Sequence, residues 1–250
     1  MTSADPSPPI VPAPRRVFLI DDHAVVRQGI SLLVRTQAPT LEIVGEAGSA
    51  NGVLEQIAGA QPDLVILDLS LPGKSGLEVL RDLRIRHPQL KVLVLSMHRD
   101  FTFAERALRA GANGYMVKTE AIDAVLTAVD KILAGQVYVS PDLASKFVQS
   151  YVNGRAGDDS GLATLSDREF EVFKLIADGL DTKEMAESLS LSIRTIETYR
   201  QNIKSKLKLR RAQDLYLFAT RWVEADRGDA SLSGPQTTEP SGGEPSRDRS

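Results

Sequence analysis

The stretch that decides the fold is residues 64–73, with the sequence LVILDLSLPG. Its first four residues are a continuous apolar run, which is typical of a parallel strand covered on both faces. Asp68 ends that run, and a Pro-Gly pair marks a turn before the helical pattern of residues 75–86. A buried strand, a carboxylate and a helix in this order indicate one unit of an α/β sheet.

The same alternation continues on both sides of this unit. Further apolar runs predict strands at 17–20, 43–44, 92–95 and 115–117. Helical patterns separate the strands, at 24–36, 52–60, 75–86, 101–110 and 121–134. Five strands and five helices in strict alternation predict a five-stranded doubly wound parallel α/β domain over residues 15–135. For residues 136–161 we expect only a helix and a polar linker.

A second, smaller domain is predicted over residues 162–226, and it is all-α. Ser166 with Glu169 forms the pattern of a capping box before an apolar stripe, which indicates a helix start. Three more helices are expected near 182–189, 192–206 and 211–224. The two ends, 1–14 and 227–250, are rich in Pro, Gly, Ser and charged residues, so we expect disordered tails.

Composition narrows the classes of function. The chain has no cysteine, which excludes disulfides and thiolate metal sites. It contains no apolar run of the ~20 residues that span a bilayer and no secretory signal, so we expect a cytoplasmic protein with no membrane partner. The net charge is −3, but residues 192–211 carry seven basic side chains and one acidic side chain. Positive charge concentrated there indicates a local phosphate-binding surface.

Polar side chains stand where the apolar runs of the first domain stop. They are Asp21, Asp22, Asp68, Ser96 and Lys118. Because the carboxyl ends of parallel strands line one crevice, these residues should converge there. Three carboxylates in one place require a cation, and Mg²⁺ prefers such oxygen ligands. With a lysine and a hydroxyl nearby, the site suits phosphoryl transfer to a carboxylate, with Asp68 as the nucleophile.

At this point the domain resembles the receiver domains of two-component response regulators. The matching stretches are residues 20–23 (IDDH), 67–76 (LDLSLPGKSG), 95–96 (LS) and 110–118 (AGANGYMVK). The resemblance implies that Asp68 accepts phosphate from a phosphohistidine on a sensor histidine kinase. It also implies an Mg²⁺ site made by Asp21, Asp22, Asp68 and the carbonyl of Ser70. Thr119 departs from the family pattern, since many receivers have proline after the lysine.

The resemblance also assigns two switch residues. Ser96 would move to bond the phosphoryl group, and Tyr115 would turn inward behind it. The alternative is an enzyme, an Mg²⁺-dependent phosphatase of the haloacid dehalogenase type. Such enzymes typically carry a second acid two residues after the nucleophile, and Ser70 stands there. The sequence therefore favours a regulator over an enzyme.

The helix expected at 192–206 is a candidate for reading DNA. Ser192 can cap it, and an apolar stripe is formed by Ile193, Ile196, Ile203 and Leu207. The opposite face carries polar and basic side chains: Arg194, Glu197, Thr198, Gln201, Lys204 and Lys208. A face of this kind fits the major groove. On the residues alone, an ordinary bundle helix or a protein-interaction module stays open.

The second domain resembles the LuxR-type helix-turn-helix, and the two domains together resemble the NarL/FixJ group of response regulators. The matching stretches include 165–169 (LSDRE), 176–180 (IADGL), 183–186 (KEMA), 191–198 (LSIRTIET) and 206–209 (KLKL). The resemblance implies double-stranded promoter DNA as partner. It implies base contacts from Glu197, Thr198 and Gln201, and places phosphate contacts at or near Lys183, Thr195, Arg200 and Lys204. Tyr199 stands where histidine is common.

Control by phosphorylation is the last expectation. The resemblance implies that the final helix supplies core and a homodimer contact, through Leu215, Leu217, Phe218 and Trp222. Before phosphorylation we expect the receiver to cover part of the recognition helix or to hold the chain monomeric. Phosphorylation would favour a dimer that presents recognition helices to half-sites about one turn of DNA apart.

Overall fold

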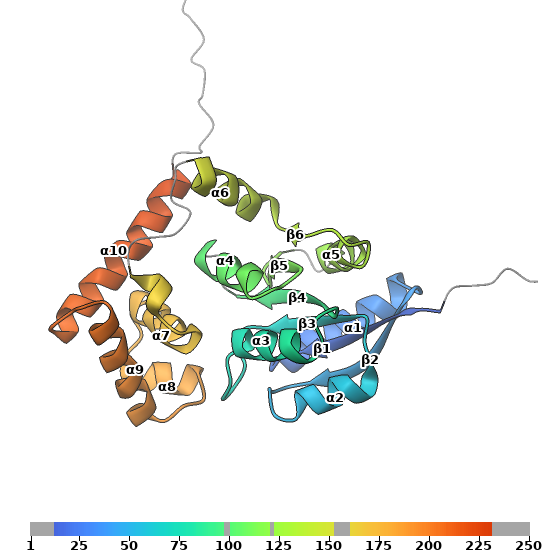
Figure 1. Ribbon diagram of the computed structural model, residues 1–250, viewed down its shortest axis with the longest axis horizontal. Coiled ribbons are helices and arrows are strands. Elements are labelled where there is room, and N and C mark those ends of the chain that lie inside the picture. Colours follow the sequence, from blue (N-terminus) through green and yellow to red (C-terminus); the bar gives the residue numbers. More distant parts are fainter. Residues whose placement is uncertain (1–12, 98–100, 121–122, 153–160, 232–250) are drawn as a thin grey trace, which may run out of the picture.

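A parallel sheet forms the centre of the N-terminal domain in the computed structural model, which describes residues 13–97, 101–120, 123–152 and 161–231 (Figure 1). The strand order is β2-β1-β3-β4-β5-β6, and every pairing is parallel. The strands are β1 (Arg15–Ile20), β2 (Leu41–Ala47), β3 (Leu64–Asp68), β4 (Lys91–Ser96), β5 (Gly114–Val117) and β6 (Tyr138–Val139).

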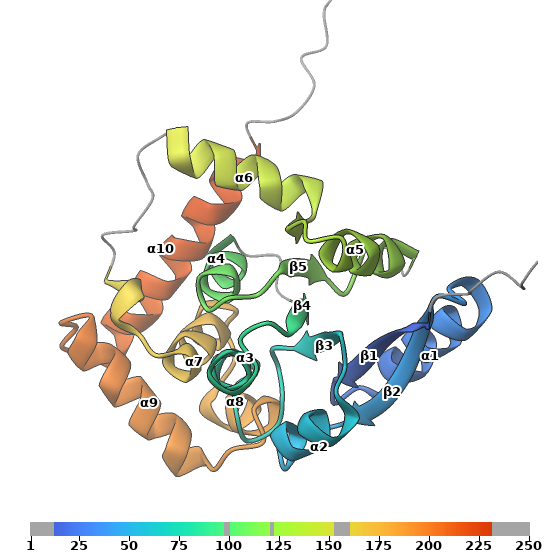
Figure 2. The ribbon, with the colours of Figure 1, turned by 45° about the vertical axis from the view of Figure 1, so that its right-hand side comes forward.

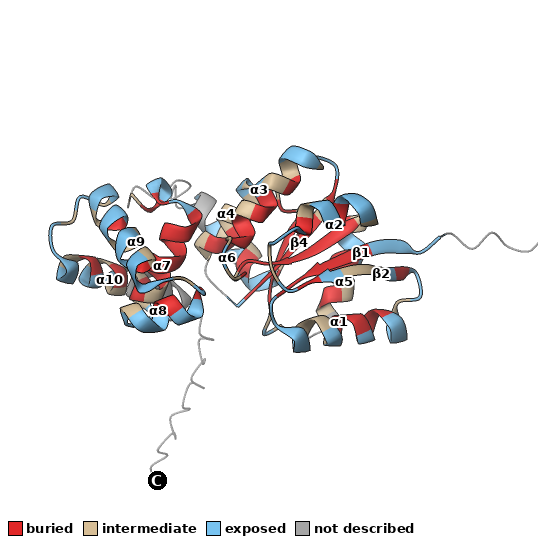
Figure 3. Ribbon diagram, turned by 90° about the horizontal axis from the view of Figure 1, so that it is seen from below, coloured by how far each residue is buried: buried red, intermediate tan, exposed pale blue. Residues whose placement is uncertain are grey.

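Helices cover both faces of this sheet (Figure 3). On one face lie α1 (Ala24–Gln37) and α5 (Asp123–Leu133); on the other lie α2 (Val53–Ala60), α3 (Gly76–Arg86) and α4 (Phe101–Arg109). Alternate residues of each strand feed separate cores: Val17 and Leu19 pack toward α1 and α5, whereas Phe18 and Ile20 pack toward α2 and α3. Burial on both faces explains why the strands are continuous apolar runs.

The sheet has six strands where the sequence predicted five. The additional strand, β6, pairs with β5 through Gly114 and Tyr138. The prediction of helix and linker only for residues 136–161 was therefore wrong at Tyr138–Val139. Two residues are too few for any periodicity to be read, and β6 forms because β5 leaves an open edge beside it. The helix α6 (Pro141–Val152) follows, and the rings of Phe101 and Phe147 pack at 4.5 Å between α4 and α6.

The C-terminal domain is helical, as predicted. It contains the 3₁₀ turn η1 (Leu162–Thr164) and the helices α7 (Asp167–Ala177), α8 (Thr182–Ser188), α9 (Ile193–Lys206) and α10 (Ala212–Ser231). The capping box is confirmed: Ser166 Oγ accepts from the Glu169 N–H, and Glu169 Oε2 accepts from the Ser166 N–H. Both α9 and α10 pack on α7, and α8 packs on α9 (Figure 2).

The helix α10 continues to Ser231, past residue 227 where a disordered tail was predicted. That part of the prediction was wrong, because a helix once nucleated continues through weakly helical residues. The rest of the predicted tails (1–12 and 232–250) and most of the predicted linker (153–160) lie outside the described residues. Among the helices that the structure describes, none has both the length and the apolarity to cross a bilayer.

Candidate functional site

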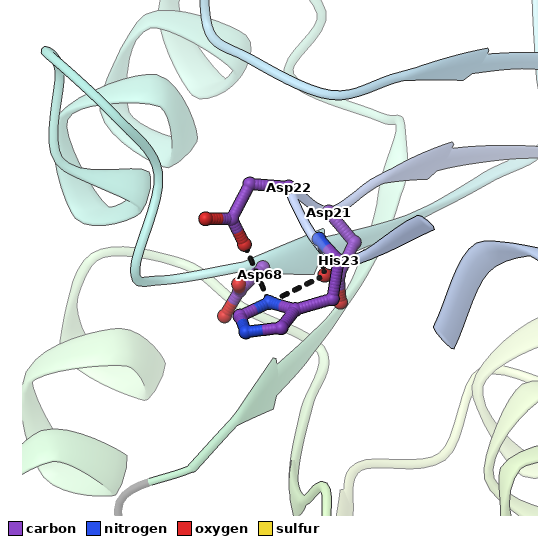
Figure 4. Close-up of side chains that lie close together, drawn as sticks. All are labelled: Asp21, Asp22, His23 and Asp68. Atoms are coloured by element: carbon purple, nitrogen blue, oxygen red, sulfur yellow. Dashed lines mark hydrogen bonds and ion pairs between the residues drawn. The ribbon is translucent and has the colours of Figure 1, made fainter. Parts of the chain in front are cut away.

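Four side chains from two strand ends meet at the carboxyl edge of the sheet (Figure 4). Asp21, Asp22 and His23 follow β1, and Asp68 ends β3. One ligand atom of each lies within 4.8 Å of all the others. Asp21 and Asp68 are buried, with 4% and 1% exposed, whereas Asp22 is exposed. The predicted convergence of the carboxylates is what the strand order β1-β3 produces.

His23 is part of this cluster, although sequence reasoning placed it only in the matching stretch 20–23 and not among the metal ligands. Its ring Nδ1 lies 2.6 Å from Asp22 Oδ1 and 3.3 Å from Asp21 Oδ1. Its backbone N–H donates to Asp21 Oδ1 at 2.8 Å. The imidazole is about half exposed, at 56%, and it therefore closes the solvent side of the acidic cluster.

Lys118 supplies the opposing charge from the end of β5. Its Nζ lies 2.7 Å from Asp21 Oδ2 and 2.8 Å from Asp68 Oδ2. The pKa of the Asp68 carboxyl is nevertheless raised, chiefly because burial disfavours its ionised form, and also because Asp21 repels it; Lys118 opposes both effects. The Ser70 N–H donates to Asp68 Oδ1 at 3.2 Å.

The donor set fits a hard divalent cation. Carboxylate oxygens from Asp21, Asp22 and Asp68 are gathered together, and one lysine ammonium cannot balance all three of their charges. No cysteine competes as a soft ligand. At the position where a phosphatase of the alternative type needs its second acid, the structure has only the Ser70 hydroxyl.

The predicted switch residues are both buried. Ser96 ends β4 and Tyr115 lies in β5, and each side chain is 0% exposed. The Lys118 N–H donates to the Ser96 carbonyl at 2.8 Å, which ties the two strand ends together. Because Tyr115 is already inside, an inward turn from an exposed position is not available to this conformation. The peptide bond that precedes Thr119 is trans.

The second candidate surface is the outer face of α9. Ser192 caps the helix as predicted, since its Oγ accepts from the Thr195 N–H at 3.1 Å. Ile196 and Ile203 are buried, but Ile193 is 55% exposed. The predicted stripe was wrong at Ile193, which is the first residue of the helix and faces solvent.

The side chains predicted to meet DNA lie on the open side of α9. Glu197, Thr198 and Gln201 are exposed, and so is Lys183 on α8. The remaining predicted contacts are Arg194, which is exposed, and Thr195, Arg200 and Lys204, which are half-buried. Lys206 points the other way, because its Nζ lies 2.6 Å from Glu169 Oε2 on α7.

The two domains touch through α7. Its Phe170 ring packs edge-on against Phe103 of α4, with centroids 4.8 Å apart, and the Arg106 guanidinium lies 4.3 Å over the same ring. Arg106 also donates to the Leu165 and Leu162 carbonyls, at 3.0 and 2.5 Å. The apolar core of the α3–α4 face is therefore continuous with the core of the C-terminal domain.

Buried polar contacts join α7 to the loop that follows Asp68. Ser75 Oγ donates to Glu171 Oε1 at 2.6 Å, and Arg168 donates to the Leu71 carbonyl at 3.2 Å. Arg168 also pairs with Glu171. Burial raises the pKa of the Glu171 carboxyl, against the attraction of Arg168. Nothing in the local pattern of α7 distinguishes these charged residues from a solvated helix face, so the sequence did not predict this contact.

The receiver does not cover the reading face of α9. Its contacts go to η1 and α7, while Glu197, Thr198 and Gln201 stay exposed. Figure 3 shows α7 between the sheet domain and the rest of the helical domain. Of the two alternatives expected before phosphorylation, covering of the recognition helix does not occur in this conformation, whereas a receiver that holds the chain monomeric stays a prediction.

Comparison with known proteins assigns both halves of the chain. Residues 17–130 match the family described as "Response regulator receiver domain", and residues 163–219 match "Bacterial regulatory proteins, luxR family". The chain therefore belongs to the response regulators that join a receiver to a LuxR-type helix-turn-helix, as in the NarL/FixJ group.

Relatives match along nearly their whole length. The chain is 39% identical over 193 residues to the "Transcriptional activator protein ExaE" of Pseudomonas putida, covering 77% of this chain and 90% of that one. It is 34% identical to the "Oxygen regulatory protein NreC" of Staphylococcus haemolyticus, covering 82% and 97%. A structure of the RcsB response regulator of Salmonella typhimurium shares 25% identity with a TM-score of 0.53, covering 83% and 99%.

Proposed function

We propose that this protein is a transcription regulator in which phosphorylation of Asp68 controls DNA binding by α8 and α9. The observation that carries the proposal is the position of Asp68. Its carboxylate is buried at a strand end, 2.8 Å from Lys118 and beside Asp21 and Asp22. In a chain with a LuxR-type DNA-binding domain, such a site suits a covalent signal better than turnover of a metabolite.

The phosphoryl donor would be a phosphohistidine on a sensor kinase. A carboxylate oxygen of Asp68 forms the new bond to phosphorus, the phosphorus–nitrogen bond breaks, and the histidine nitrogen keeps the electron pair. Lys118 pairs with Asp68 before transfer and lies where it can bind the phosphoryl oxygens afterwards. Ser96 would donate its hydroxyl to the same group.

Mg²⁺ would be held by Asp21, Asp22, Asp68 and the carbonyl of Ser70. When bound, it neutralises charge that gathers on the phosphoryl oxygens during transfer. Asp21 and Asp68 are positioned by the sheet, whereas Asp22 is on the solvent side and contacts His23. The His23 contact is made to one of the two carboxylate oxygens of Asp22.

Double-stranded promoter DNA would lie against the outer face of α9. Glu197, Thr198 and Gln201 would reach base edges, and phosphates would be held by Lys183, Arg194, Thr195, Arg200 and Lys204. The exposed reading face suits this role directly. A homodimer of the phosphorylated chain would place two such faces on two half-sites.

Phosphorylation is tested first. The protein and its Asp68→Asn variant are incubated with acetyl phosphate and Mg²⁺, and intact masses are compared. We expect one phosphoryl group on the wild type, none on the variant, and none on either protein when EDTA is present. Equal phosphorylation of both proteins would refute Asp68 as the acceptor. A mobility shift on genomic fragments, with and without acetyl phosphate, then tests whether the modification controls DNA binding.

The DNA face has a separate prediction. Thr198→Ala and Gln201→Ala should relax base preference, at about 1–3 kcal/mol for each good base contact, because base edges carry the sequence information. Lys204→Ala should weaken binding to all sequences alike and reduce the salt dependence, because phosphates are the same everywhere. Affinities measured on matched and mismatched duplexes at several salt concentrations separate the two effects. Wild-type behaviour of all three variants would exclude α9 from the groove.

A further inference from the structure

Glu197 is an acidic residue on the most basic segment of the chain. It is the only acid between residues 192 and 211, which carry seven basic side chains. Its side chain is 51% exposed on the outer face of α9. Facing a duplex, a carboxylate is repelled by the phosphates and weakens binding to every sequence alike, unless it gains a partner in the groove.

Two neighbours hold this carboxylate in place. Thr182, the first residue of α8, donates its hydroxyl to Glu197 Oε1 at 3.1 Å. Arg200, one turn further along α9, lies 3.7 Å from the same oxygen. Arg200 also donates to Thr182 Oγ1 at 2.6 Å. The three side chains therefore form a closed polar cluster between the two helices, which lie side by side (Figure 2).

The donors and acceptors available in this cluster determine the direction of its hydrogen bonds. An arginine has no acceptor, so Arg200 must donate and the Thr182 oxygen must accept. The single hydroxyl proton of Thr182 is then free only for Glu197. Arg200 is 24% exposed, and its charge offsets that of Glu197. Both contacts end on Oε1, which leaves Oε2 to accept from a group outside the protein.

The four bases differ in the groups that they present to a Glu197 carboxylate in the major groove. Guanine presents two acceptors and thymine presents an acceptor and a methyl group, so both repel a carboxylate. Adenine presents an amine beside an acceptor. Cytosine presents an amine donor alone, which makes it the best match for a carboxylate oxygen.

We propose that Glu197 reads a cytosine amine in each half-site, and that Thr182 is the positioning residue that makes the reading selective. This inference rests on the proposed function, since it requires α9 to enter the groove. It adds a specificity-determining residue on α8 and names the base. It also assigns Arg200 to balancing Glu197, in place of the phosphate contact that the family resemblance implied.

A purely structural role for the cluster makes a different prediction. An exposed ion pair three residues apart on a helix contributes little to stability, so its loss would lower the melting temperature only slightly. It would leave base preference unchanged. Base preference is therefore the measurement that separates the two roles.

The experiment selects duplexes from a randomised library with the full chain, phosphorylated by acetyl phosphate. Thr182→Val removes the hydroxyl at nearly constant shape, and Thr182→Ser restores it. Glu197→Gln replaces the carboxylate with an amide. The matched control is Thr220→Val on α10, where the hydroxyl donates to the Tyr216 and Leu217 carbonyls of its own helix. Thermal unfolding confirms that each variant is folded.

The wild type should select cytosine at one position of each half-site, with a preference of roughly tenfold or more. Thr182→Val should reduce that preference to about twofold, because the released carboxylate samples several orientations. Thr182→Ser and Thr220→Val should keep it. Glu197→Gln should change the selected base from cytosine to adenine, since an amide pairs with both the amine and the ring acceptor of adenine.

Several results would overturn the inference. If Thr182→Val keeps the wild-type preference, Thr182 does not position the reader. If Glu197→Gln still selects cytosine, another side chain reads that base. Weaker binding of Thr182→Val to all sequences, with an unchanged base preference, would mean that Thr182 serves the phosphates. If the wild type selects no sequence at all, it is the proposed function that fails, and this outcome is distinct from the others.

Discussion

At the scale of single residues, the fold buries Asp68 at a cost in stability. The raised pKa of this carboxyl means that the folded chain keeps a proton at a pH where the unfolded chain has lost it. Protonation of Asp68 therefore contributes to the free energy of unfolding. This contribution is complete below the ordinary pKa of 3.8 and is lost as the pH rises through the raised pKa. At neutral pH the buried, ionised Asp68 carboxylate therefore lowers the stability of the folded chain, although the site needs it for function.

Asp68→Asn removes the buried negative charge and should therefore stabilise the folded chain. In EDTA we expect the variant to exceed the wild type in free energy of unfolding by on the order of 1 kcal/mol at about pH 8. The difference in free energy of unfolding should narrow as the pH falls toward the ordinary value of 3.8, because the wild-type carboxyl takes up its proton above that value. Urea unfolding of both proteins across this pH range is the measurement.

Mg²⁺ provides the control for this prediction. A cation that binds the folded acidic cluster stabilises the protein by mass action, and it should stabilise the wild type more than Asp68→Asn because the variant lacks one ligand charge. A variant less stable than the wild type at both ends of the pH range, without metal, would show that burial of Asp68 does not oppose folding.

The residues of the acidic site were predictable because strand order alone brings them together. Asp68 ends a strand, Asp21 and Lys118 directly follow one, and parallel strands place their carboxyl ends at one edge. Thr182 was not predictable in this way. Its role depends on a side-chain contact across the turn between α8 and α9, and no spacing in the sequence encodes that contact.

At the scale of elements, the start of α3 fixes the geometry beside Asp68. The Gly76 N–H donates to the Leu69 carbonyl at 2.9 Å. A Cβ at Gly76 would lie 2.2 Å from the Asp68 carbonyl oxygen and 2.6 Å from Leu69 Cα. Only glycine lets the helix approach the phosphoacceptor backbone so closely.

Gly76→Ala should therefore disturb both stability and chemistry. Backbone must move to admit the methyl group, at about 1–3 kcal/mol, and the displaced Asp68 should be phosphorylated more slowly by acetyl phosphate. Gly59→Ala in α2 is the matched control, because nothing lies within 4 Å of its added Cβ. The control should gain about 0.5–1 kcal/mol and phosphorylate normally. Equal phosphorylation rates in the two variants would contradict the role given to Gly76.

Elements with strong patterns were predicted, and weakly patterned ones were not. The run at β3 and the capping box at α7 each carry a local signal strong enough to define an element. The strand β6 has only two residues, and the last turns of α10 contain no apolar stripe. In both cases neighbouring structure, rather than local sequence, determines the conformation.

At the scale of the whole molecule, the domain contact joins the loop after Asp68 to α7. No sequence pattern predicted it, since its partners are up to 97 residues apart in the chain. The contact leaves the reading face of α9 open, so a restraint that this contact places on DNA binding would act through the orientation of the helical domain. Two recognition helices must meet half-sites about one turn apart, and a helical domain fixed to its own receiver cannot adjust to that spacing.

Arg81 of α3 forms an ion pair with Asp167 of α7, and this pair offers a direct test of the restraint. Asp167 is buried, and Arg106 lies 3.4 Å from it on the other side. Arg81→Asp places two carboxylates together and should open the contact. We then expect the unphosphorylated variant to bind operator DNA several-fold more tightly than the unphosphorylated wild type, because opening frees the helical domain to adjust.

An uncharged substitution at the same position is the control. Arg81→Ala removes the ion pair without placing a second carboxylate beside Asp167, which keeps Arg106 at 3.4 Å, so its DNA affinity should lie between those of the wild type and Arg81→Asp. Small-angle scattering of each unphosphorylated protein measures whether the domains have separated. Separated domains with unchanged DNA affinity would mean that the contact does not restrain binding. Phosphorylation would then act through the dimer that it favours, because a population shift requires that the two states differ in affinity.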